Sequence, residues 1–62
     1  MYRYELYGLC SDLKTHTKYI YRKNPITEEE RREKLAGNYA DYLAEKYNTS
    51  VVLYGCNERG EI

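Results

Sequence analysis

One strong helix signal lies in the middle of the chain and constrains what the rest can form. Thr27 precedes three consecutive glutamates and forms a capping box with Glu30, which takes the N3 position. The acidic first turn also suits the positive end of a helix dipole. We expect the helix to run from about residue 28 to 47, with Asn48 as its C-terminal stop. A helix of that length spans about 30 Å, so it dominates a chain of 62 residues.

This helix is predicted to be apolar along one side of its second half only. The stripe consists of Leu35, Ala36, Tyr39, Ala40, Leu43, Ala44 and Tyr47, bordered by Tyr42. Projected back by helical spacing, the same side meets Arg31 and Arg32, so the first turns are expected to overhang the core. Gly37 costs about 1 kcal/mol relative to Ala inside a helix, and it would permit the close approach of a sheet or of another helix.

The flanking segments predict strands. Residues 2–9 alternate in polarity, residues 15–23 are rich in β-branched and aromatic types, and residues 50–56 form a continuous apolar run. Asn24-Pro25 ends the second strand, since the residue before Pro is held extended and Pro cannot donate to a ladder. We expect residues 50–56 to be buried on both faces or central in the sheet. Residues 57–60 have the composition of a turn.

The order β-β-α-β predicts a single α+β domain over residues 1–62. We expect a three-stranded, mainly antiparallel sheet in the order 2-1-3 with the helix across one face. The helix is expected to pack Leu35, Tyr39, Ala40, Leu43, Ala44 and Tyr47 on Tyr4, Leu6, Ile20, Val51 and Leu53 or their strand neighbours. Which strand face is inside stays open, and the other face of the sheet is left uncovered.

The aromatic composition makes this uncovered face the centre of the functional argument. The chain has nine tyrosines and neither Phe nor Trp. A tyrosine has an apolar ring and a hydroxyl that needs water or a partner, so a core built from it reaches the surface. A chain this short also has a thin margin of stability, which favours a partner or a second copy.

No pattern of catalytic or metal-binding residues emerges from the remaining side chains. Cys10, His16 and Cys56 lack the paired spacing of structural zinc sites, so no metal and no other cofactor is expected. Cys10 and His16 could meet across the first turn, but a nucleophile also needs an orienting group and an oxyanion site. We therefore expect a protein that is not an enzyme. Both cysteines end strands about 15–20 Å apart, too far for a disulfide.

Charge divides the chain into a basic and an acidic part. Residues 1–24 have five Lys or Arg against two acids, a balance of +3, and residues 25–62 have five against eight, a balance of −3. The basic stretch mixes cations with tyrosines, which supports single-stranded nucleic-acid binding as an alternative function. Its candidate residues are Lys14, His16, Lys18, Arg22 and Lys23. Strict alternation, however, places His16, Lys18 and Arg22 on the face opposite Tyr19 and Tyr21, and the whole chain is neutral.

The function expected from these observations is non-enzymatic binding of a protein partner or of a second copy of the chain. The candidate contacts are Tyr19, Tyr21, Tyr42, Arg31 and Arg32. No membrane span and no signal peptide is expected, so the predicted location is the cytoplasm. Chains of this size are often accessory proteins that modulate a larger machine, including those of phages and other mobile elements.

Overall fold

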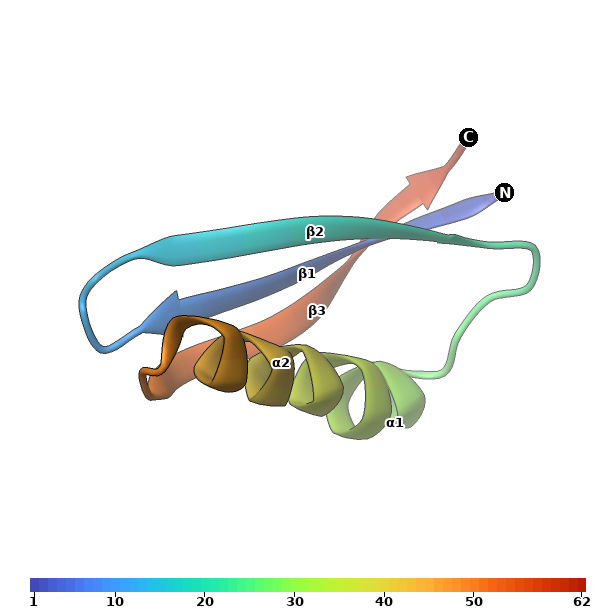
Figure 1. Cartoon of the computed structure of the whole chain (residues 1–62). Helices are drawn as coiled ribbons and strands as arrows, with labels where there is room; N and C mark the ends of the chain where they lie inside the picture. The colour runs from blue at the N-terminus through green and yellow to red at the C-terminus, as the bar shows by residue number, and fades with distance from the viewer.

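Three strands and one helix make up the fold. The computed structural model describes residues Met1–Ile62, with β1 at Tyr2–Cys10, β2 at Thr15–Arg22 and β3 at Val51–Glu61. The helix consists of α1 (Glu28–Glu30), η1 (Arg31–Ala36) and α2 (Gly37–Tyr47). Both strand pairs are antiparallel and the order is β2-β1-β3, with the helix on one side of the sheet (Figure 1). The predicted α+β architecture and strand order are confirmed.

The helix begins and ends where the sequence predicts. The Thr27 hydroxyl accepts a hydrogen bond from the Glu30 N–H at 3.2 Å, which satisfies one of the free donors of the first turn. At the other end Asn48 adopts a left-handed conformation with φ of 50°, a common helix stop. The sequence did not indicate the π-helical hydrogen bonding of Arg31–Ala36 in the middle. This wider segment joins α1 to α2 without interrupting the helix.

The third strand differs most from the prediction. It continues to Glu61, so the turn expected at residues 57–60 is wrong. It is also an edge strand, and Val52, Leu53 and Tyr54 are 61%, 56% and 48% exposed, so the expectation of burial on both faces is wrong as well. Register shifts relative to β1 occur near both ends of β3, and such bulges bend a strand and re-aim its side chains. They let a segment with turn composition pair as a strand.

The alternation of side chains along β1 determines which of its residues belong to the core. Tyr4, Leu6 and Cys10 of β1 are buried against the helix, together with Ala36, Tyr39, Ala40 and Leu43. The helix lies over β1 and β3 rather than over β2. Ile20, Leu35, Ala44 and Val51 are only partly buried, and two other expected core residues are exposed. Leu53 pairs with Leu9, which lies on the uncovered face, and Tyr47 is an exposed residue that stacks on His16 with ring centroids 4.2 Å apart.

Tyr4 is the most deeply placed aromatic residue, and its hydroxyl is not left without a partner. The Tyr4 Oη accepts a hydrogen bond from the Ile26 N–H at 2.8 Å, and the Arg31 guanidinium lies over the ring, 5.7 Å from its centroid. A buried hydroxyl that is hydrogen-bonded avoids the cost of an unsatisfied polar group. The contact also fixes the connection between β2 and the helix against the sheet.

The two ends of the chain are hydrogen-bonded to each other. The amino group of Met1 donates to the Ile62 carbonyl at 2.7 Å, and the Ile62 N–H donates to the Met1 carbonyl at 2.8 Å. Both ends leave the sheet on the same side, beyond the end of the helix-covered region (Figure 1). The sheet is thereby extended by one residue pair past β1 and β3.

The strand register also separates the cysteines. Cys56 pairs with Leu6, four residues from Cys10 along β1, which corresponds to about 13 Å at the rise of a strand. This exceeds the roughly 7 Å that a disulfide tolerates between Cα atoms, and both thiols are free. The separation is shorter than the predicted value of about 15–20 Å, because β3 continues past Cys56 and this residue does not end a strand.

Candidate functional site

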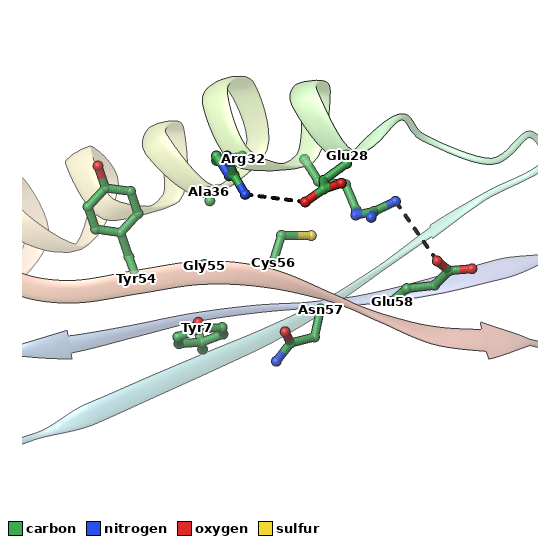
Figure 2. Close-up of a pocket in the computed structure, with 10 residues that line it drawn as sticks. Tyr7, Glu28, Arg32, Ala36, Tyr54, Gly55, Cys56, Asn57 and Glu58 are labelled. Atoms are coloured by element: carbon green, nitrogen blue, oxygen red, sulfur yellow. Dashed lines mark hydrogen bonds and ion pairs between the residues drawn. The ribbon is translucent and has the colours of Figure 1, made fainter.

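The uncovered face of the sheet, called the bare face below, is a surface that no helix or strand of the chain covers. It is formed by the β1 residues that alternate with the core, by their cross-strand partners on β2, and by part of β3. These residues are Arg3, Glu5, Tyr7, Leu9, Thr15, Thr17, Tyr19, Tyr21, Leu53, Gly55, Asn57 and Arg59. Figure 2 shows Tyr7 and Asn57 on the side of β3 that faces away from the helix.

Glu5 organises the polar part of the bare face. Its carboxylate accepts hydrogen bonds from the Arg59 guanidinium at 2.8 Å, the Tyr19 hydroxyl at 3.0 Å and the Asn57 amide at 3.4 Å. These donors, Arg59 above all, hold the pKa of Glu5 below its ordinary value, because each stabilises the charged form. The hydrogen bond between Tyr19 and Glu5 also raises the pKa of Tyr19, so the phenol stays protonated. One carboxylate thus connects all three strands.

Two tyrosine rings are held in place on this face. The Arg3 guanidinium lies 5.6 Å from the centroid of the Tyr19 ring, and its Nε is buried without a hydrogen-bond partner. Tyr7 lies across Gly55, where an added Cβ would come within 2.6 Å of the Tyr7 Cζ. A cross-strand glycine covered by an aromatic ring is a known stabilising arrangement in sheets. The rings are therefore ordered before any partner arrives, which lowers the entropy cost of binding.

A second feature is a cleft of about 380 Å³ between the helix start and β3 (Figure 2). Arg32 pairs with Glu28 at 3.2 Å, and Arg31 lies 4.0 Å from Glu58. Cys56 lines the same cleft, and burial raises the pKa of its thiol, so the neutral form dominates near pH 7. The four charged residues that line this cleft form two opposite-charge pairs, so no lining charge is left without a partner to attract an ion.

A third feature is a shallow groove between the helix and β2, with a volume of about 340 Å³. Because the helix lies over the other two strands, the helix-side residues of β2 are left at its margin. Lys18 and Arg22 flank an apolar base formed by Ile20, Leu35 and Tyr39, with Tyr42 on the helix above. The groove is open and narrow, and its cations are exposed.

The five predicted contact residues do not form one site. Tyr19 and Tyr21 lie on the bare face, and Tyr42 lies on the helix beside the groove toward β2. Arg32 lies in the cleft with an exposed side chain. Arg31 differs from the expectation of an overhanging residue. Its side chain is only 18% exposed, it covers Tyr4, and it donates to the Ile26 carbonyl at 2.6 Å. Arg31 thus stabilises the connection to the helix.

The alternative set for nucleic-acid binding is also divided. Lys18 and Arg22 pair across from Leu6 and Tyr2, on the helix side, and His16 is occupied by stacking on Tyr47. Lys14 lies in the turn between the strands and Lys23 follows β2. Tyr19 and Tyr21 face the other way. The predicted separation of the cations from the aromatic residues is confirmed by the register.

Of the bare face, the sequence indicated only Tyr19 and Tyr21, and it missed Arg3, Glu5, Tyr7 and Arg59 among others. Arg3, Glu5 and Tyr7 are odd-numbered residues of β1, whose side chains alternate with those of the core. They could have been assigned to the bare face once the buried face was known. Arg59 could not be assigned to a sheet face, because residues 57–60 were predicted to form a turn and not a strand. No three His, Cys, Asp or Glu side chains come together as a group that could hold a metal ion.

Comparison with protein-family models, with curated proteins and with solved structures gave no match to this chain. No helix of the structure combines the length and the apolar character needed to cross a bilayer. The functional argument therefore rests on the geometry of the surfaces described above.

Proposed function

We propose that this chain is a non-enzymatic protein-binding module that engages a protein partner with the bare face of its sheet. The observation that carries the proposal is the set of ordered tyrosines beside two arginines, Arg3 and Arg59, on a sheet face that no element covers. Tyrosine and arginine are the residue types most enriched among contacts that dominate binding energy in protein interfaces.

The charge of the bare face indicates the chemistry of the partner. Two guanidinium groups flank one carboxylate, so the face has a net charge of +1 around its aromatic rings. A partner surface that is apolar at its centre and mildly acidic at its rim is complementary to this arrangement. Arg32 and Tyr42 lie on other sides of the molecule, outside the proposed interface.

The test compares variants of the bare face with a variant of the helix. Tagged wild-type protein, Tyr21→Asp, Leu9→Asp and the control Tyr42→Asp are used to capture partners from a lysate of the source cells. The captured complex is then studied by hydrogen exchange. We expect the two bare-face variants to lose the partner and Tyr42→Asp to retain it, with added protection at β1 and β2. Capture that survives both bare-face variants contradicts the proposal.

The same set of proteins tests the nucleic-acid alternative. Binding to a single-stranded oligonucleotide is measured at low salt for wild type and for Lys18→Glu/Arg22→Glu. A protein that binds the oligonucleotide, and loses this binding in the double variant, has its functional surface on the helix side of β2. That result overturns protein binding through the bare face, and an absence of oligonucleotide binding removes the alternative.

A further inference from the structure

The two edges of the sheet differ in how they are protected from pairing with another chain. The β2 edge and its flanks have four cations, Lys14, Lys18, Arg22 and Lys23, and charged edges, especially those with lysine, discourage strand addition. The β3 edge has no lysine and no proline. Its exposed stretch Val52-Leu53-Tyr54 belongs to a strand of eleven residues, so β3 offers a long unpaired ladder (Figure 1).

The sequence of this edge is compatible with pairing to itself. No residue from Val52 to Asn57 is charged, so an antiparallel copy of the segment places no like charges opposite each other. The bulges lie near the ends of β3 and leave the stretch from Leu53 to Glu58 in regular register with β1. A regular strand of this length is long enough to form a ladder with a second copy.

Because of the position of the helix, pairing of two β3 strands would also bring the two helices together. The helix lies over β1 and β3, and neighbouring strands are about 4.8 Å apart. A two-fold axis between paired β3 strands therefore places the two helices on the same side of the sheet, about 9.6 Å apart. Packed helices have interaxial distances of 8–10 Å. Pairing at the β3 edge thus brings the two helices into contact without any rearrangement.

Gly37 fits this arrangement and is not explained by the single chain. An added Cβ at Gly37 would meet no atom within 4 Å, and its φ of −61° suits any residue, so neither space nor backbone geometry requires glycine. Helical spacing places Gly37 and Ala44 on the β3 side of the helix, away from Asn38 and Tyr42, which line the groove toward β2. Small residues there allow a second helix to approach closely.

The size of this side of the molecule is of the same order as the surface that a specific dimer buries. The molecule measures 33 × 19 × 15 Å, so the side formed by β3 and the helix covers on the order of 500 Å² in projection, and its accessible area is larger. Specific interfaces bury about 600–1,000 Å² on each partner. Because the core contains only seven buried hydrophobic side chains, this added burial is a substantial gain for the fold.

We infer that two copies of this chain associate through antiparallel pairing of their β3 edges, with the Gly37 sides of their helices in contact. The product is a continuous six-stranded sheet in the order β2-β1-β3-β3-β1-β2, covered on one side by two antiparallel helices. The bare faces of both copies then form one uninterrupted surface. This inference does not depend on the proposed function. The dimer forms through the β3 edge of the sheet, whereas the protein partner is proposed to bind the bare face.

The first experiment measures mass by light scattering and sedimentation over a range of protein concentrations. We expect wild type to approach twice 7.4 kDa, also at high salt. Val52→Lys/Tyr54→Lys should be monomeric with an unchanged circular dichroism spectrum, since both side chains are exposed and neither lies in the Glu5 cluster. The matched control, Leu13→Lys/Asn24→Lys, changes exposed residues that flank β2 and lie outside the bare face, and it should associate like wild type.

A second variant separates assembly from folding. Gly37→Leu improves helix propensity and meets open space in the single chain, so the folded monomer should be retained. In the dimer the new side chain lies between the helices, and we expect the dissociation constant to rise at least ten-fold. Lys34→Leu, on the exposed side of the helix, is the control and should leave the dissociation constant unchanged.

Three results overturn the inference: a monomer at every concentration, a dimer that Val52→Lys/Tyr54→Lys does not weaken, or a dimer that Tyr21→Asp alone disrupts. The last result indicates face-to-face association. The capture experiment is read separately, because the edge variants leave the tyrosines of the bare face in place and should still bind the protein partner.

Discussion

On the helix-covered side of β1, Tyr4 and Leu6 are buried and the tyrosine hydroxyl is bonded to the backbone of Ile26. On the bare side of the same strand, Glu5 bonds to side chains of both neighbouring strands and Tyr7 lies across Gly55. The residue types are similar, but the covered side is organised by burial and the bare side by polar contacts at the surface. Stability is therefore expected to depend on the first side and recognition on the second.

The largest expected effect comes from truncating the covered side. Leu6→Ala removes a buried side chain between Tyr39 and Leu43 and should lower the free energy of unfolding by about 2–5 kcal/mol. Leu9→Ala, three residues along on the bare side, should cost no more than about 1 kcal/mol. Urea denaturation followed by circular dichroism measures both. Equal losses would mean that the bare side is covered in solution.

A smaller effect is expected at two glycines, where substitution by alanine should change the stability in opposite directions. A Cβ at Gly8 would lie 2.5 Å from the Leu43 Cδ1, so Gly8→Ala forces the core to shift and should destabilise the fold by about 1–3 kcal/mol. Gly37→Ala meets open space and should stabilise the monomer by about 1 kcal/mol. Denaturation is measured at one low protein concentration. A loss of stability in Gly37→Ala at that concentration would show that the single chain itself needs this glycine.

The smallest effect concerns pH and the bare side alone. The pKa of Glu5 is depressed in the folded state, chiefly by Arg59, so the stabilisation is present above the ordinary carboxyl pKa of 4.5 and is lost as pH falls through the folded value. Melting temperatures between pH 7 and pH 2.5 should fall less steeply in Glu5→Gln than in wild type. Glu45→Gln, exposed on the helix, is the control. Parallel curves for wild type and Glu5→Gln would show that the cluster does not form in solution.

The helix and two of the strands could be predicted because their signals are local. The capping box at Thr27, the stop at Asn48 and the alternation along β1 each depend on residues close in sequence. The end of β3 could not be predicted in this way. Residues 57–60 have turn composition, and they are extended because Asn57 and Arg59 reach Glu5, more than fifty positions earlier in the chain.

The candidate site was predicted only in part for a related reason. Tyr19 and Tyr21 were recognised as exposed aromatic residues, but tyrosines occupy both sides of β1, so composition does not indicate which side the helix covers. That choice is made by the helix as a whole, through Leu43 and Tyr39. Once the covered side of β1 is known, the alternation of side chains along the strand places Arg3, Glu5 and Tyr7 on the bare face.

The hydrogen bonds between Met1 and Ile62 have a practical consequence for protein engineering. Because the amino and carboxyl ends meet in adjacent strands, a short linker could join them into a circular chain, with new ends opened in the exposed turn of residues 11–14. The β-β-α-β order would become β-α-β-β, and the pairing of the three strands would be retained. The same proximity makes the chain suitable for insertion into a surface loop of another protein, where both junctions lie side by side.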